Sequence, residues 1–192
     1  MMMSRKFLQT PNSIILGIDP GYGRIGIAVI EKGGGVPTSP KLRGTKEKLL
    51  HSECFEISAK ISHPERLLAL GNKVAKIIKK YKPDHVAVET LLFSKNQKTA
   101  LQVAEARGVI LLEAARKNIL VREFNPNQIK LAITGYGKSD KKQVTSMVEK
   151  LIKMSSKKRL DDEYDAIAIA LTCAAISLST DKLQSYCKNF PI

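Results

Sequence analysis

The apolar residues of this chain form short runs and helically spaced stretches that predict alternating strands and helices. Two apolar runs, 14–19 and 25–30, flank a break at Pro20, which is the pattern of two antiparallel strands joined by a turn. A third strand is expected at 49–58. Apolar residues at helical spacing then predict a helix from about residue 62 to Pro83, because proline cannot continue it.

The second half of the chain continues the alternation. The expected elements are a strand at 84–89, a helix at 98–118, a strand at 119–124, a short helix at 126–134, a basic helix starting near Ser139 and a last helix at 161–177. Three strands in an antiparallel meander, followed by alternating helices and parallel strands, predict an α/β fold. Its mixed five-stranded sheet flanked by helices is the layout of ribonuclease H-like folds.

The 192 residues suit one domain, and three segments are expected to lie outside its regular structure. They are an N-terminal extension at 1–12, a tail at 179–192 and a loop at 31–48 that is rich in Gly, Pro and Lys. The N-terminus lacks the apolar core of a signal peptide, and no apolar run reaches the roughly 18 residues that span a bilayer. We therefore expect neither export nor membrane insertion.

The charge balance indicates more about the partners of this chain than its hydrophobic content does. Thirty-two Lys and Arg against 18 Asp and Glu give a formal net charge of +14. Such an excess attracts polyanions, nucleic acid first, although an anionic membrane surface or plain solubility would also account for it. The three cysteines form no CxxC pair, so a cytoplasmic location is the simplest expectation.

Carboxylates stand at three places where the fold would hold them rigidly. Asp19 and Glu89 each end a predicted strand, and Asp162 and Asp165 share one face at the start of the last helix, as Asp161 and Asp165 also would. Simpler explanations exist, because Asp19 could accept hydrogen bonds from the turn after it, and acids commonly stabilise the first turn of a helix. Neither explains an acid beside an otherwise apolar helix face.

Several carboxylates gathered in one place are what two-metal phosphoryl chemistry requires. Two Mg²⁺ ions about 4 Å apart stabilise the attacking and leaving oxygens of an in-line displacement, and hard cations of this kind prefer charged oxygen ligands. The candidate metal ligands are therefore the two strand-end acids, Asp19 and Glu89, and an acid pair at the start of the last helix, either Asp162 with Asp165 or Asp161 with Asp165.

Two nucleotide-binding motifs are excluded. Gly21, Gly23 and Gly26 spell G-x-G-x-x-G, but the last glycine opens strand material rather than a phosphate-binding helix. Gly137 to Ser139 match the end of a P-loop whose first glycine would fall on Ala132. The three histidines share no ligand spacing, so neither a histidine metal site nor a histidine general base is indicated.

These features lie in the segments GIDPG at 17–21, AVE at 87–89, FSKN with AEARG down to Gly108, GYGKSDKKQV, and DDEYDAIAIAL. Together the segments resemble the family of RuvC-type Holliday-junction resolvases. The resemblance spans about 14–175 and implies a ribonuclease H-like nuclease that resolves four-way DNA junctions by paired nicks with Mg²⁺, or Mn²⁺ in its place. It implies that the catalytic residues and metal ligands are Asp19, Glu89, Asp162 and Asp165, with Asp162 favoured over Asp161 through the family's D-x-x-D-A pattern.

The resemblance also points to DNA contacts and partners. Lys130 and Lys141 fall on basic positions that the family uses near the scissile phosphate, and the family's junction-point aromatic corresponds to Leu92, with Phe93 next to it. The basic residues expected to bind DNA are Lys95, Lys130, Lys138, Lys141 and Lys142, although any one of them could be merely solvated surface. A homodimer and a branch-migration helicase complex are implied as partners.

One helix is the candidate dimer interface. The stretch 98–118 has many apolar residues and a glycine, Gly108, that would allow close approach; the alternative is a helix wholly covered by its own domain. Three other functions stay open: an actin-like ATPase or sugar kinase, which normally needs far more chain, a junction-binding protein without catalysis, and a related nuclease acting on RNA.

Overall fold

A mixed five-stranded sheet forms the centre of the protein. The computed structural model describes residues 13–33, 47–91, 97–155 and 157–176, and the strand order within them is β3-β2-β1-β4-β5. The first three strands form an antiparallel meander, and the last two are parallel to the first. Their bounds are β1 (Ser13–Asp19), β2 (Arg24–Lys32), β3 (Lys48–Glu56), β4 (His85–Glu89) and β5 (Leu120–Phe124). The predicted ribonuclease H-like layout is confirmed.

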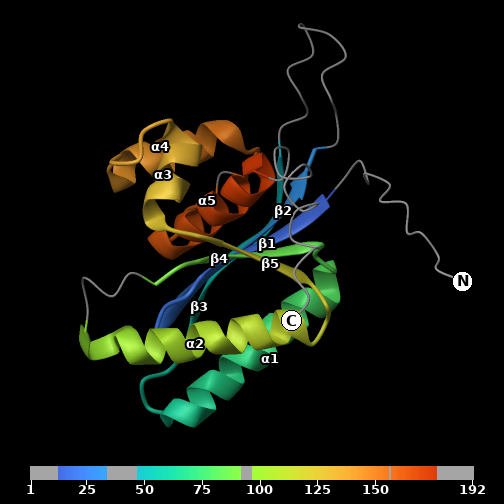
Figure 1. Ribbon diagram of the computed structural model, residues 1–192, viewed down its shortest axis with the longest axis vertical. Coiled ribbons are helices and arrows are strands. Elements are labelled where there is room, and N and C mark those ends of the chain that lie inside the picture. The colour runs from blue at the N-terminus through green and yellow to red at the C-terminus, as the bar shows by residue number, and fades with distance from the viewer. Residues whose placement is uncertain (1–12, 34–46, 92–96, 156, 177–192) are drawn as a thin grey trace, which may run out of the picture.

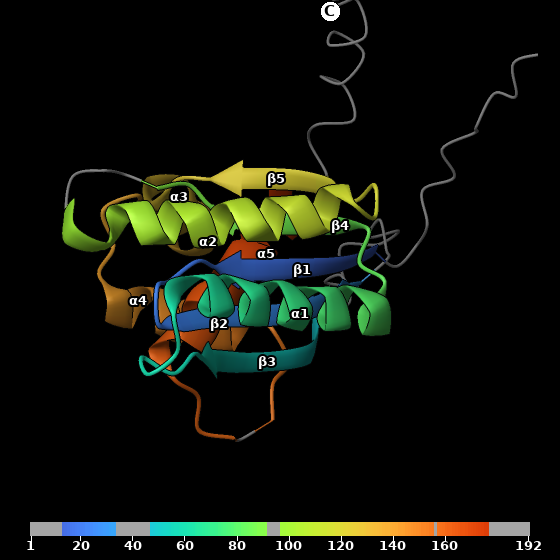
Figure 2. The same ribbon diagram turned by 90° about the horizontal axis from the view of Figure 1, so that it is seen from below.

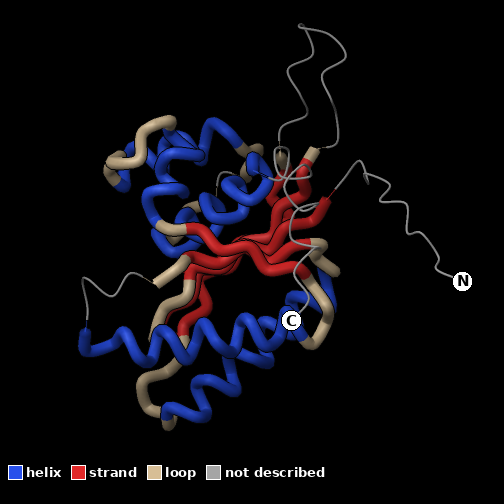
Figure 3. The backbone as a smooth tube through the Cα atoms, viewed as in Figure 1, coloured by secondary structure: helices blue, strands red, loops and turns tan. Residues whose placement is uncertain are grey.

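Helices cover both faces of the sheet. One face carries α1 (His63–Tyr81) and α2 (Gln97–Ala115), which lie side by side. The other carries α3 (Pro126–Thr134), α4 (Lys141–Leu151) and α5 (Asp161–Ile176). Figures 1 and 2 show these two helical layers with the sheet between them, and Figure 3 shows the strands as one continuous central layer.

Two separate cores follow from the alternation of side chains along the strands. Leu16 and Ile18 of β1 face α1 and α2, whereas Ile15 packs in the core beneath α3, α4 and α5. Because side chains alternate with a period of two, Gly17 and Asp19 lie on the same face as Ile15. The end of β1 therefore directs its carboxylate toward the α5 layer.

Two glycines let α5 lie unusually close to the sheet. A Cβ at Gly17 would overlap the carbonyl oxygen of Ala166, and one at Gly26 would overlap the carbonyl oxygen of Asp162. Since every other residue has a Cβ, only glycine fits at these two positions without moving the helix. The first turns of α5 thus rest on the backbone of β1 and β2.

Several predicted boundaries were wrong. The loop expected at 31–48 is shorter, because Glu31 and Lys32 pair with β1 and Lys48 pairs with β2; backbone pairing does not need apolar side chains. The centre of this loop, residues 34–46, lies outside the described residues, as do both predicted terminal segments, 1–12 and 179–192. The helix expected to reach Asn118 ends at Ala115, because Asn118 adopts a left-handed backbone conformation (φ 53°) and the chain turns there. The third strand ends at Glu56 rather than at Ser58.

The basic helix begins two residues later than expected. Asp140 is its N-cap and accepts a hydrogen bond from the backbone N–H of Gln143, while the Gln143 side chain accepts one from the backbone N–H of Asp140. This reciprocal arrangement fixes the start of α4 at Lys141.

None of the described helices is both long enough and apolar enough to cross a lipid bilayer.

Candidate active site

Asp19 and Glu89 lie next to each other at one edge of the sheet. They are the last residues of β1 and β4, which pair in parallel with Ile18 opposite Val88. The carboxyl ends of parallel strands meet at the same edge, and Ala87, two residues before Glu89, packs in the core on the α5 side. Both carboxylates therefore face the helix that carries the other two candidate acids.

The start of α5 supplies those two acids. Asp162 and Asp165 are three residues apart, so both can face the sheet edge, and Gly26 brings the backbone of Asp162 against β2. The Asp161 side chain is 73% exposed, compared with 25% for Asp162 and 35% for Asp165. This difference favours Asp162 over Asp161 as the inward-facing member of the acid group.

The four acids act on one another electrostatically. Burial, followed by the negative charges of Glu89, Asp165 and Asp162 in that order, raises the pKa of Asp19 from 3.8 to about 7. Burial and the charge of Asp165 likewise raise the pKa of Glu89 to about 7. Burial also raises the pKa of Asp165, although Lys141 opposes the shift. Such mutual repulsion shows that the fold brings the acids together without fully neutralising them.

Three cationic side chains border the acid group. The Lys141 Nζ lies 3.2 Å from an Asp165 carboxylate oxygen and 3.3 Å from one of Asp161. Lys130 lies near enough to Glu89 to oppose the rise of its pKa. Arg24, at the start of β2, donates a hydrogen bond from its guanidinium to Asp162. Lys130 and Lys141, the two lysines indicated by the family resemblance, therefore lie next to acids of this group.

The acid group has the chemistry of a divalent-cation site but is not pre-assembled as one. Among the described residues, no three Asp, Glu, His or Cys side chains converge closely enough to hold a metal ion as they stand. Two of the four carboxylates are held in ion pairs, Asp162 with Arg24 and Asp165 with Lys141. Charged oxygens whose ionisation is suppressed by mutual repulsion are suited to Mg²⁺ or Mn²⁺, which relieve that repulsion when bound.

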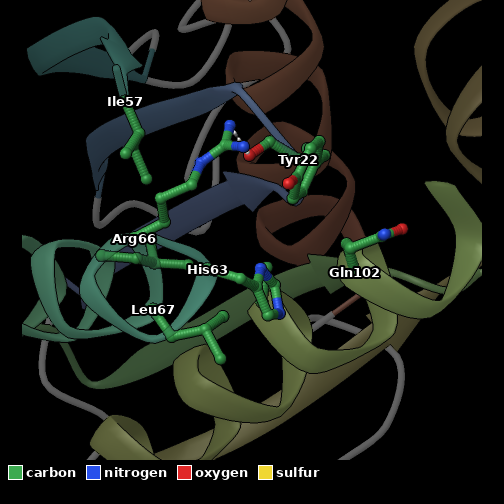
Figure 4. Close-up of a pocket in the computed structure, with 9 residues that line it drawn as sticks. Tyr22, Ile57, His63, Arg66, Leu67 and Gln102 are labelled. Carbon is green, nitrogen blue, oxygen red and sulfur yellow. Dashed lines mark hydrogen bonds between the residues drawn. The ribbon is translucent and has the colours of Figure 1, made fainter. Parts of the chain in front are cut away.

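A small pocket beside the site contains the support for the turn that follows Asp19. The buried Arg66 of α1 donates a hydrogen bond of 2.8 Å to the backbone oxygen of Tyr22, and its guanidinium stacks 3.8 Å from the centre of the Tyr22 ring. Figure 4 shows Arg66 reaching from α1 to the turn, with His63 and Gln102 at the pocket wall. This contact fixes the turn, and with it the end of β1.

The remaining predicted residues are not part of the acid group. Lys138 and Lys142 are exposed on the connection between α3 and α4 and on the first turn of α4. Lys95 and Phe93 lie outside the described residues, as does Leu92. The hydroxyl of Ser139, in the near-match to a P-loop, hydrogen-bonds the backbone oxygen of Tyr136 at 2.8 Å.

The histidines have structural partners. His51 lies 2.8 Å from Glu53, and His63 lies 2.6 Å from Glu105, which links α1 to α2.

Sequence reasoning missed Arg24, Cys54 and the buried Glu163. The Cys54 Sγ lies 3.7 Å from a carboxylate oxygen of Asp162, and Cys54 is directly opposite Gly26 in the sheet. Glu163 accepts a 2.7 Å hydrogen bond from the Ser52 hydroxyl. The alternation of side chains along β2 could have identified Arg24. It places Arg24 on the same face as Gly26 and Ala28, the small residues on which α5 packs.

Sequence comparison identifies a single family for this arrangement. The family profile described as crossover junction endodeoxyribonuclease RuvC matches residues 15–173. The RuvC protein of Petrotoga mobilis is 43% identical over 157 residues, which cover 82% of this chain and 90% of the relative. That of Thermosipho melanesiensis is 42% identical over 162 residues, covering 84% and 96%.

Solved structures agree in fold and extent. Thermus thermophilus RuvC superposes with a TM-score of 0.76 at 30% identity, covering 86% of this chain and 95% of that one. The same protein in complex with a Holliday junction substrate gives a TM-score of 0.74 at 30% identity, covering 86% and 94%. The yeast mitochondrial Holliday junction resolvase, at 14% identity over 92% of this chain and 84% of its own, shares the fold with a TM-score of 0.61. The chain therefore belongs to the crossover junction endodeoxyribonuclease RuvC family.

Proposed function

We propose that this protein is a nuclease that resolves four-way (Holliday) DNA junctions during recombination and repair by nicking two strands symmetrically. The observation that carries the proposal is the meeting of Asp19, Glu89, Asp162 and Asp165 at one sheet edge, with the pKa values of Asp19 and Glu89 both raised to about 7. A fold that maintains such repulsion loses stability unless a cation relieves it. In a chain of the RuvC family, we expect that cation to take part in phosphodiester hydrolysis.

The four acids are proposed as ligands of two Mg²⁺ ions, for which Mn²⁺ would substitute. Bound divalent metal supplies charge neutralisation at the phosphate and a more acidic attacking water. Asp19 is the most central acid, since the other three all act on its pKa, and it is the best candidate to serve both ions. The turn held by Arg66 keeps the Asp19 carboxylate fixed while DNA binds.

Two lysines are proposed to act on the substrate beside the acids. The Lys141 ammonium group, now 3.2 Å from Asp165, can transfer its hydrogen bond to a phosphate oxygen once that carboxylate binds a cation. Lys130 lies near Glu89 and can neutralise a neighbouring phosphate. Lys138 and Lys142, which are exposed, are proposed to contact further phosphates, and Lys95, outside the described residues, is proposed to bind DNA as well. Phe93 is proposed to contact the bases at the junction point.

The active unit is proposed to be a homodimer, because a junction has two equivalent strands to cut and the chain has one acid group. Four residues of α2 form an exposed stripe at helical spacing: Leu101 (67% exposed), Glu105, Gly108 and Leu112 (49% exposed). A Cβ at Gly108 would have no neighbour within 4 Å. The alternative of a helix wholly covered by its own domain is therefore wrong for this stripe, and a second copy can approach closely there.

Two further aspects of the function are proposed. The lack of a CxxC pair among the three cysteines favours the cytoplasm as the place where the protein acts, and the family resemblance favours a branch-migration helicase complex as its partner. Retention of a purified helicase complex on immobilised junction DNA, only when this protein is present, would test the second proposal.

The decisive experiment compares DNA substrates and two matched substitutions. A four-way junction should be cut in the presence of Mg²⁺, whereas duplex, single-stranded DNA and an RNA–DNA hybrid should not. Asp162→Asn should abolish cleavage with junction binding retained, and Asp161→Asn, one residue away but exposed, should keep activity. Cleavage of the hybrid alone would favour the RNA-directed nuclease, and junction binding without any cleavage would favour the binding protein.

A further inference from the structure

Arg24 forms an ion pair with Asp162, one of the four acids. It begins β2, its side chain is 49% exposed, and its guanidinium donates a hydrogen bond to the Oδ2 atom of Asp162. The Cys54 Sγ lies 3.7 Å from the same oxygen. The pKa of Arg24 is raised, first by its contact with Cys54 and then by the charge of Asp162.

Asp162 differs from the other three acids in the cation that it contacts. Among the described residues, Asp19 and Glu89 form no ion pair, and Asp165 is paired with Lys141 rather than with Arg24. A guanidinium has five N–H donors and no acceptor, so it can neutralise a carboxylate but cannot share the coordination of a metal ion. While Arg24 donates to the Oδ2 atom of Asp162, its positive charge competes with a metal ion for that carboxylate.

We propose that Arg24 is an internal counter-ion of Asp162 that a divalent metal ion displaces, so that Arg24 sets how much metal the site needs. The inference rests on the proposed metal ligands and goes beyond them, because it concerns a residue that coordinates nothing. Displacement is inexpensive in conformational terms, because the Arg24 side chain is half exposed and can rotate into solvent. Without metal, the pair prevents a fourth negative charge from adding fully to the repulsion at Asp19.

Removing the counter-ion should tighten metal binding by a modest factor. Exposed ion pairs contribute little, so Arg24→Ala is expected to increase the affinity of the DNA-free protein for Mn²⁺ by about 1.5- to 5-fold. Arg24→Lys should give an intermediate value, because it keeps the charge but loses the planar, two-pronged donor geometry. Without metal, Arg24→Ala should also lower the melting temperature, and saturating Mn²⁺ should remove that difference.

A double-mutant cycle measured by calorimetry tests the proposal without DNA or turnover. Mn²⁺ is titrated into full-length wild type, Arg24→Ala, Asp162→Asn and the double variant. If Arg24 acts through Asp162, the gain in affinity should disappear in the Asp162→Asn background. Arg116→Ala provides the control, since this arginine directly after α2 pairs with Glu113 and should leave Mn²⁺ affinity unchanged.

Two results would overturn the proposal. One is an Arg24→Ala variant whose Mn²⁺ affinity equals that of wild type. The other is an equal gain in the Asp162→Asn background, which would mean that Arg24 merely repels metal at long range. Neither result affects the junction-cleavage assay, so a failure here can be distinguished from a failure of the proposed function. A folded wild type that binds no Mn²⁺ would overturn the metal assignment as well.

Discussion

The ionisation of Asp19 should reduce the stability of the metal-free protein as the pH rises. Its pKa is about 7 in the folded protein and 3.8 in the reference state, so the folded form holds a proton that the unfolded chain has already lost between those values. Stability linked to this proton is fully present below about pH 4 and is lost progressively up to about pH 7. At about 1.4 kcal/mol per pKa unit, the loss reaches ~4 kcal/mol.

Asp19→Asn removes the charge and keeps the shape, so it should recover this free energy. In EDTA, the variant is expected to be more stable than wild type by up to ~4 kcal/mol at pH 8 and by about 2 kcal/mol at pH 5.5, with no difference near pH 4. Urea unfolding at the three pH values measures this directly. Saturating Mg²⁺ should stabilise wild type at pH 8 much more than the variant, because binding to the folded state alone adds stability.

A matched control and a clear contradiction are both available. Asp161→Asn removes a carboxylate from the same acidic region, but its side chain is exposed and its change in stability should stay below about 1 kcal/mol at every pH. An Asp19→Asn protein that is less stable than wild type at pH 8 in EDTA would refute the reasoning. So would a gain in stability that does not change with pH.

Four shorter predictions follow from the same structure. Mn²⁺ binding should release close to two protons at pH 6 and none at pH 9, because the pKa values of Asp19 and Glu89 are both about 7. Calorimetry that finds equal proton release at the two pH values would contradict this. Lys141→Ala should reduce the salt dependence of junction binding by about 0.9 in log affinity per log salt, measured by fluorescence anisotropy, if it contacts one phosphate. Leu112→Glu should shift the solution mass from dimer to monomer, whereas Leu68→Glu on α1 should not. Gly26→Ala should abolish junction cleavage with all four acids intact, unless α5 can shift without moving them.

The strand ends were predictable because a local pattern decides them. A run of apolar residues that stops at a carboxylate, as at Asp19 and Glu89, places that acid at a sheet edge whatever the rest of the fold does. The start of α5 was predictable for the same reason, since acids in a first helical turn are a local signal. These local signals indicated the candidate acids, whereas the choice of Asp162 over Asp161 came from the family resemblance.

The contacts between distant segments were not predictable from one sequence. Arg24 and Asp162 are 138 residues apart, and nothing near either of them indicates the other. Their meeting depends on how closely α5 packs on β2, which is decided by Gly26 and by the pairing of Cys54 opposite it. The exposure of the α2 stripe likewise depends on which face α1 covers, a choice that helical periodicity alone leaves undecided.

The close packing of α5 on Gly17 and Gly26 has a consequence for judging which relatives of this protein are active. The separation between the strand acids and the helix acids is set by two residues without side chains, because the helix backbone rests directly on the sheet backbone there. A relative can therefore retain every carboxylate and still be inactive if either glycine has acquired a methyl group. Inspection of the acids alone would wrongly classify such a protein as a nuclease, so both glycines belong among the residues that diagnose activity.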